Sequence, residues 1–178
     1  NKYTHVNLPP FVPWKSNLKD YETILNRYHI KNLYHFTSKQ NIASIKKNGG
    51  LFSWAECREK GIHINCSGGD SLSHKLDNDA GLDGYVRLRF TRNHPMMFYK
   101  GIEDAVVLRI DRTVVYWKGN KYSDMNATRS GAKIGCSLDD FRAIHFSTVQ
   151  SKNQFVLPED ERMYYQAEVL VKNSIPLE

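Results

Sequence analysis

The order of apolar and polar positions predicts an irregular start followed by a helix. Prolines within residues 9–13 remove backbone donors and disfavour a helix there. Residues 16–28 then repeat apolar side chains at helical spacing, which predicts a short amphipathic helix capped by Ser16 or Asn17. We expect this helix to pack across a sheet or to reach toward a partner.

The next part of the chain predicts one strand and one helix. Residues 33–36 are expected to form the first core strand, and residues 39–47 the helix. The Asn-Gly-Gly run of residues 48–50 tolerates a positive φ and ends that helix. Residues 51–80 are the least regular part, with one short helix expected near residues 71–77. A long irregular segment in a compact domain often serves as a lid or binding loop.

The second half of the chain predicts mainly strands. Alternating or continuous apolar runs predict three of them, at residues 85–90, 105–110 and 113–117. The remaining segments predict a loop, a brief helix and a polar, mobile stretch, at residues 123–132, 138–144 and 147–160. Many strands with few helices favour the α+β class.

A carboxylate stands inside the last predicted strand. Residues 169–171 strongly favour a buried strand, and the alternation of polar and apolar side chains over residues 164–171 suits a pleated edge that faces a cleft. Glu168 lies within this run, and burying a carboxylate without a partner is costly. We therefore expect Glu168 either to face water on a half-exposed strand or to take part in chemistry.

Length and composition indicate a single globular domain. The chain has 178 residues, of which 40% are hydrophobic and 12% aromatic, enough to bury a core. No apolar run approaches membrane-spanning length and no leader opens the chain, so we expect a cytosolic protein without a membrane partner. The chain starts at Asn1 rather than Met, which indicates a trimmed start.

Charge and cysteine content narrow the class of partner. A net charge of +6 favours a polyanion such as nucleic acid. Three cysteines without a Cys-x-x-Cys pair fit a reducing compartment better than a disulfide framework. One short stretch holds four residues of metal-binding type, Cys57, His63, Cys66 and His74. Their spacing matches no common zinc motif, so we expect no metal.

Several short blocks occur together in a defined order. They read LYHFT at residues 33–37, NIASIKKNGGL at 41–51, YVRLRF at 85–90, HPMM at 94–97, SDMNA at 123–127 and QAE at 166–168. In this order they resemble the DarT family of nucleic-acid ADP-ribosyltransferases. The resemblance implies an ADP-ribosyltransferase-like split β-sheet core over residues 33–178, with residues 1–32 as an N-terminal extension that carries a short helix.

The resemblance also implies an NAD site with assigned residues. Glu168 would stabilise the cationic ribose formed when the nicotinamide bond breaks, and would also take the acceptor proton. The residues that would hold NAD as a substrate are His35, Phe36, Thr37, Ser44 and Phe52. His35 has a second interpretation, as a histidine whose hydrogen bonds are satisfied at a strand end. No Gly-x-Gly-x-x-Gly is present, so this is not a Rossmann site.

The chain departs from the family at one position. Where the family places a catalytic arginine, this chain has His74 and Lys75. Either side chain can meet a diphosphate or activate the acceptor, but neither has the planar fork of arginine. Substitutes from elsewhere in the chain are Arg58, Arg87 and Arg89.

Basic and aromatic residues near the C-terminus predict a contact with single-stranded nucleic acid. Phosphates would be neutralised by Lys152, Arg162, Arg129 and Lys133. Exposed bases would stack on Tyr164, Tyr165 and Phe155. The alternative is that these are ordinary solvated cations and tyrosines that cover the core.

The leading hypothesis is an NAD-dependent enzyme that transfers ADP-ribose to a nucleobase of single-stranded DNA. By resemblance it would be a bacterial toxin of a toxin–antitoxin or anti-phage system, held in check by a cognate antitoxin protein. RNA is the alternative acceptor, followed by a protein. The rival from another class is a non-catalytic nucleic-acid-binding domain of the same fold.

Overall fold

The computed structural model describes residues 5–6, 13–64, 75, 79–93 and 104–176. Its helical elements are α1 (Leu18–Arg27), η1 (Lys39–Asn41), α2 (Ile42–Asn48), α3 (Trp54–Lys60), η3 (Arg112–Tyr116), α5 (Leu138–Arg142), α6 (Phe146–Val149), η4 (Gln154–Val156) and η5 (Glu159–Gln166). Its strands are β1 (His5–Val6), β2 (Asn32–Ser38), β3 (Gly50–Phe52), β4 (Tyr85–Arg89), β5 (Ala105–Asp111), β6 (Lys121–Ser123), β7 (Ile134–Gly135), β8 (Glu168–Lys172) and β9 (Ser174–Pro176). These elements confirm the α+β class.

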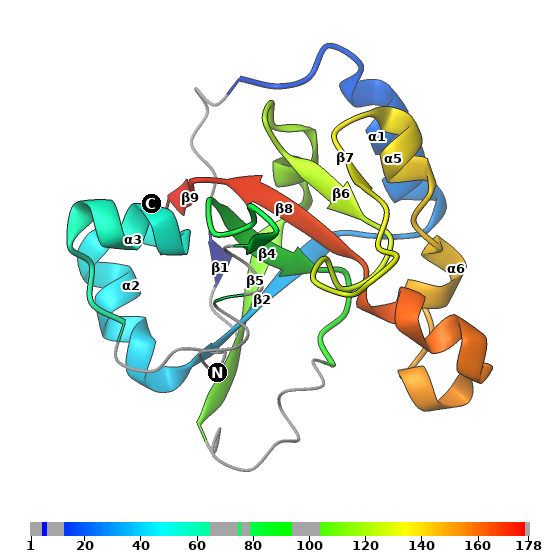
Figure 1. The fold of residues 1–178 in the computed structure, drawn as a ribbon. Helices are drawn as coiled ribbons and strands as arrows, with labels where there is room; N and C mark the ends of the chain where they lie inside the picture. The colour runs from blue at the N-terminus through cyan, green and yellow to red at the C-terminus, as the bar shows by residue number, and fades with distance from the viewer. Residues whose placement is uncertain (1–4, 7–12, 65–74, 76–78, 94–103, 177–178) are drawn as a thin grey trace.

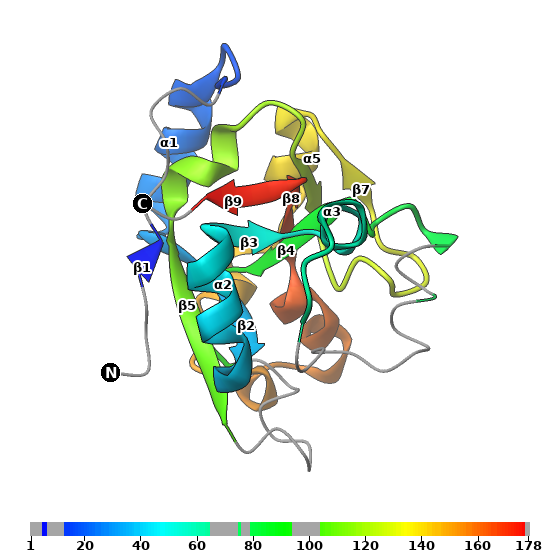
Figure 2. The same cartoon turned by 90° about the vertical axis from the view of Figure 1, so that its left-hand side faces the viewer.

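The strands form one large sheet and one small ribbon. The large sheet has the order β1-β5-β2-β4-β8-β6-β7, with α2 and α3 on one side of the molecule and α1, α5 and α6 on the other (Figure 1). The ribbon pairs β3 with β9 beside α2 (Figure 2). No helix in the described ranges is long and apolar enough to cross a bilayer.

Strand β8 occupies an interior place in the sheet. It pairs with β4 from Tyr85↔Lys172 to Arg89↔Glu168, and with β6 on its other side. Its residues 168–171 are all buried, as expected of a strand with neighbours on both sides. The buried strand predicted for residues 169–171 is confirmed, whereas the pleated edge expected over residues 164–171 was wrong. The first three of those residues close η5, and the strand begins at Glu168.

The large sheet is split between β2 and β4. β2 pairs with β5 along its whole length, from Asn32↔Asp111 to Ser38↔Ala105. On its other side, within the described residues, it meets β4 at one pair, Tyr34↔Arg89. Beyond that pair the two strands separate, so the split-sheet prediction is confirmed.

Helix α1 contributes to the same core as the sheet. Tyr21 and Leu25 are 1% and 0% exposed, and the Tyr21 ring lies 5.7 Å from that of Tyr122 and 5.0 Å from that of Phe141. Lys15 extends this contact, because its Nζ lies 4.6 Å from the Tyr122 ring centroid. A domain boundary at residue 32 stays a prediction, although the helix before it shares the core.

One predicted strand was wrong because local contacts set the conformation. Residues 113–117 were expected to form a strand, but the structure has η3 there, where the Asp111 carboxylate accepts from Thr113 N at 2.9 Å. A short buried apolar run does not distinguish a strand from a helical turn. For residues 147–160, expected only to be polar and mobile, the structure has most of α6, all of η4 and the start of η5.

Three predicted helices are confirmed, and one helix was missed. The helices expected over residues 16–28, 39–47 and 138–144 are confirmed as α1, as η1 with α2, and as α5. Helix α3 was missed, although Ser53 accepts from Glu56 N at 3.2 Å and Gly61 ends the helix at φ 66°. The helix expected near residues 71–77 lies outside the described residues, apart from Lys75.

Candidate active site

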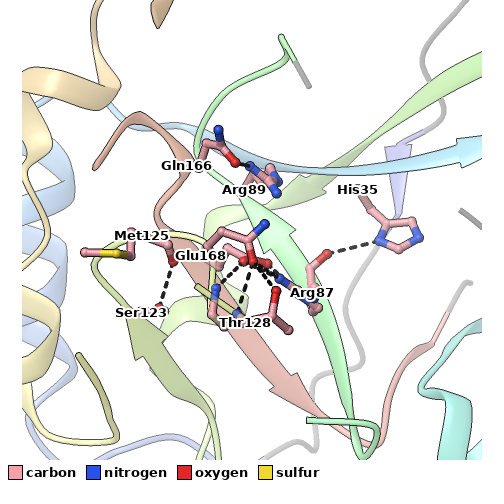
Figure 3. A network of polar contacts seen from close by, with 10 residues as sticks. His35, Arg87, Arg89, Ser123, Met125, Thr128, Gln166 and Glu168 are labelled. Carbon is pink, nitrogen blue, oxygen red and sulfur yellow. Dashed lines mark hydrogen bonds and ion pairs between the residues drawn. The ribbon is translucent and has the colours of Figure 1, made fainter. Parts of the chain in front are cut away.

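The Glu168 carboxylate is buried and is bound by an arginine from the neighbouring strand. Its side chain is 1% exposed. Arg87 donates from Nε to Oε2 at 2.8 Å and from Nη2 to Oε1 at 2.6 Å (Figure 3). In the register Glu168 lies opposite Arg89, so Arg87 is the diagonal neighbour on the same face, which a long side chain reaches. The result is a two-point ion pair inside the sheet.

The turn after β6 binds both members of this pair. Ala127 N donates to Glu168 Oε1 at 2.8 Å, and Arg87 Nη2 donates to Asn126 Oδ1 at 2.8 Å. Thr128 also donates to Asn126 Oδ1, from its backbone N at 3.1 Å and from Oγ1 at 2.8 Å. Two consecutive residues of one turn therefore hold the arginine and the carboxylate (Figure 3).

These contacts keep Glu168 ionised at neutral pH. Burial alone raises the pKa of its carboxyl, because the charged form loses water. The charge and hydrogen bonds of Arg87, the charge of Arg89 and the Ala127 N–H act in the other direction. They prevail, and the pKa of Glu168 lies below its ordinary value. The site therefore presents a fixed carboxylate rather than a carboxylic acid.

His35 bridges the split between β2 and β4. Its Nδ1 lies 3.1 Å from the backbone carbonyl oxygen of Arg87, and since a carbonyl only accepts, Nδ1 carries the proton (Figure 3). Burial lowers the pKa of the imidazole, more than the hydrogen bond to Arg87 raises it. His35 is therefore neutral at pH 7, with Nε2 as an acceptor. The hydrogen bond to the Arg87 backbone also links His35 to the arginine that binds Glu168.

The other residues expected to bind NAD lie on β2, α2 and β3. Phe36 and Thr37 follow His35 in β2, and Asn41 Nδ2 donates to Thr37 Oγ1 at 3.1 Å. Ser44, in α2, donates from Oγ to the His63 carbonyl oxygen at 3.0 Å. Phe52 ends β3.

The residues proposed at the place of the family arginine are not brought to Glu168 within the described part of the chain. Lys75 is exposed, and His74 lies outside the described residues. Of the substitute arginines, Arg58 pairs with Asp83, and Arg89 Nη1 lies 3.4 Å from Gln166 Oε1. Arg87 is the one that contacts Glu168.

Two segments that carry predicted nucleic-acid contacts precede Glu168 in the chain. Arg129 and Lys133 are exposed in the loop after β6, and Arg129 comes two residues after the Ala127 N–H that binds Glu168. In the second segment, Lys152 and Arg162 are exposed in the stretch that leads into β8. The basic residues are thus solvent-accessible, as a phosphate contact requires.

The two tyrosines before Glu168 differ in environment. The Tyr164 ring is partly exposed and stacks on His145, with centroids 3.7 Å apart and planes at 14°. The Tyr165 side chain is 3% exposed, so the expectation that it stacks on a base was wrong. Its ring belongs to the core, because η5 is helical and turns these neighbouring residues in different directions.

Sequence reasoning missed the turn that supports the site. Residues 123–127 were singled out as a familiar block, but no role was given to Asn126 or Ala127. The Ala127 contact is made by a backbone N–H, which leaves no signature in the residue type. The acceptor role of Asn126 had one signal, since Asn in a tight turn commonly binds backbone N–H groups.

Comparison with known proteins is consistent with this geometry. Residues 34–178 match the family described as "ssDNA thymidine ADP-ribosyltransferase, DarT". No curated protein sequence matches the chain.

Solved structures of two organisms share the fold. Thermus sp. 2.9 DarT in complex with ADP-ribosylated ssDNA is similar with a TM-score of 0.68 and 20% identity, over 83% of this chain and 78% of that chain. The same protein in complex with NAD+ has a TM-score of 0.64 and 20% identity, over 83% of this chain and 77% of that chain. Thermosipho africanus DarTG in complex with ADP-ribose has a TM-score of 0.66 and 22% identity, over 82% of this chain and 41% of that chain.

The family match covers residues 34–178, which is most of the chain. The chain belongs to the DarT family of NAD-dependent ssDNA thymidine ADP-ribosyltransferases.

Proposed function

We propose that this chain transfers ADP-ribose from NAD to a thymidine base of single-stranded DNA, with Glu168 as the carboxylate beside the reacting ribose. The observation that carries this proposal is the burial of the Glu168 side chain inside the sheet, where it is 1% exposed and bound at two points by Arg87. A half-exposed strand residue without a role would not need these contacts.

The reaction needs a fixed negative charge near the ribose. When the bond between nicotinamide and ribose breaks, the sugar becomes oxocarbenium-like, and a preorganised carboxylate stabilises that charge. Glu168 Oε1 accepts from Arg87 and from Ala127, whereas Oε2 accepts one bond from within the described residues. Since a carboxylate oxygen has two acceptor sites, Oε2 has capacity for a ribose hydroxyl.

The same contacts limit the second role considered for Glu168. A carboxylate whose pKa is lowered is a weak base, so it removes the acceptor proton poorly. The proposal therefore gives Glu168 the electrostatic role at the ribose. His74 and Lys75 remain the candidates for the diphosphate or for acceptor activation.

Residues of β2 would hold NAD. Neutral His35 offers Nε2 as an acceptor for a ribose hydroxyl, since its Nδ1–H is already donated to Arg87. Thr37 Oγ1 accepts from Asn41, which leaves its own O–H to donate toward the nicotinamide amide, together with the backbone of Phe36. Ser44 and Phe52 would line the same site from α2 and β3.

The DNA strand would lie across the loop after β6 and the stretch that leads into β8. Lys152, Arg162, Arg129 and Lys133 would meet phosphates, and the partly exposed Tyr164 would stack on a base. The proposed biological role is that of a bacterial toxin or anti-phage effector that acts in the cytosol and is restrained by an antitoxin. The DarTG relative is a longer chain, of which the match covers 41%.

The test is the mass of an oligonucleotide incubated with the protein and NAD. The proposal expects one added ADP-ribose on a thymidine-containing single strand and none on a strand of the same length without thymidine. Modification of an RNA oligonucleotide in preference to DNA would instead support the alternative acceptor. Absence of both NAD binding and mass gain would favour a non-catalytic binding domain.

A further inference from the structure

We propose that Arg87 is a positioning residue of this transferase, which orients the Glu168 carboxylate so that Oε2 faces the ribose, and that Asn126 holds Arg87 in place. This inference rests on the proposed role of Glu168 at the ribose. It adds that the carboxylate depends on a specific arginine and a specific turn for its orientation.

The fork geometry fixes a torsion angle. Arg87 donates from two nitrogens to two different oxygens, at 2.8 Å from Nε to Oε2 and 2.6 Å from Nη2 to Oε1. A rotation of the carboxylate about its last bond breaks both contacts together, because the guanidinium is planar. A lysine at this position supplies charge without that constraint.

The turn after β6 binds both Arg87 and Glu168. Asn126 Oδ1 accepts from Arg87 Nη2 and from two donors of Thr128, so the amide oxygen is fixed by its own turn. The next residue, Ala127, donates to Glu168 Oε1 at 2.8 Å. That bond lies on Oε1, and this leaves Oε2 as the oxygen that faces the ribose.

Other groups near Glu168 do not reproduce the role of Arg87. Arg89 faces Glu168 in the register and adds positive charge, but its Nη1 lies 3.4 Å from Gln166 Oε1. His35, on β2, is neutral and binds the Arg87 backbone. Asp124, after β6, is buried and accepts from Lys133 N at 2.9 Å. Loss of Arg87 therefore removes both hydrogen bonds to the carboxylate and part of the positive charge near it. The charge of Arg89 remains.

The experiment separates orientation from charge with two substitutions. Arg87→Lys keeps a cation and removes the fork, and Arg87→Gln removes both. Arg142→Gln is the matched control, since Arg142 forms an exposed pair with Asp139 at 3.4 Å. For each variant we measure kcat, KM for NAD and the pH dependence of kcat, using mass gain of a thymidine-containing oligonucleotide.

We expect Arg87→Lys to lower kcat by about tenfold or more with little change in KM, because a small misplacement of a reacting group is costly. The acid limb of its pH profile should stay near that of wild type. In Arg87→Gln the buried carboxyl loses its main counter-charge, so the acid limb should move up by about one pH unit or more. Arg142→Gln should match wild type.

The outcomes distinguish this inference from the proposed function. If Glu168→Gln is inactive while Arg87→Lys retains kcat within twofold of wild type, the positioning role is wrong and the role of Glu168 stands. If Glu168→Gln is active, the proposed function itself fails. If Arg87→Gln does not fold, Asn126→Ala takes its place. That variant keeps the ion pair and loses its support, and an unchanged kcat there would overturn the inference.

Discussion

The Arg87 guanidinium holds both oxygens of the Glu168 carboxylate, at 2.6 and 2.8 Å, from the diagonal position of the neighbouring strand. The carboxylate is 1% exposed and the arginine side chain 24%. Burying such a pair contributes little net stability, because desolvation offsets the attraction. Its value lies in a carboxylate that stays charged and oriented within a sheet.

His35 is expected to contribute to NAD affinity through Nε2. The substitution His35→Ala should weaken NAD binding by roughly 1–3 kcal/mol, the cost of leaving a polar partner unpaired. Calorimetric titration with NAD measures this. The control is His29→Asn, since His29 is exposed with φ 52°, a conformation that Asn tolerates. Normal NAD affinity combined with a lower melting temperature would show that His35 only joins β2 to β4.

The neutral state of His35 should make stability depend on pH. Because the folded pKa lies below the ordinary value of 6.5, the unfolded chain takes up the proton first as pH falls. The contribution of neutral His35 to the free energy of unfolding is therefore complete above pH 6.5. It is lost as pH falls toward the folded pKa, at about 1.4 kcal/mol for each unit by which the pKa is lowered. Urea unfolding at about pH 7.5 and 5.5 should show a smaller loss for His35→Gln than for wild type. Equal losses would contradict a neutral His35.

Phosphate contacts should appear in the salt dependence of binding. Each neutralised phosphate of a single strand contributes about 0.7 to the slope of log affinity against log salt. Lys152→Ala should flatten the slope for a single-stranded oligonucleotide by about that amount. The exposed Lys118, in the turn before β6, gives the control Lys118→Ala. A slope unchanged by Lys152→Ala and by Arg162→Ala would remove this segment from the DNA path.

The two tyrosines before Glu168 should behave differently. Tyr164 is partly exposed, so Tyr164→Ala should lower affinity by about 1–3 kcal/mol at every salt concentration, with the slope kept. Tyr165 is 3% exposed, so Tyr165→Ala should instead lower the free energy of unfolding, by about 3–5 kcal/mol as for other buried aromatic residues. Fluorescence anisotropy and urea unfolding measure the two effects. Similar behaviour of both variants would contradict the assignment.

Much of the fold could be predicted from local patterns. Apolar runs predicted β4 and β5 closely, and helical spacing predicted α1. The pattern failed for η3, where apolar residues 113–117 are buried in a helical turn that local capping favours. It also failed for residues 164–166, since alternation over three residues fits both a strand and a short helix.

The site could be predicted only in part. Glu168 and His35 stood out because each lies in a short block typical of the family. The contact of Arg87 with Glu168 joins residues 81 positions apart, so it depends on the register of β4 and β8. The Ala127 contact uses a backbone group. Neither is visible without the tertiary structure.

The most direct measurement is transfer by Glu168→Gln compared with wild type in a single turnover, read as mass gain on a thymidine-containing single strand. Glutamine keeps the shape of the side chain and removes the charge that the oxocarbenium-like state needs. We predict a loss of about 10²–10³-fold or more in the rate, while the dissociation constant for NAD changes little. Near-normal transfer by Glu168→Gln would contradict the account at its centre.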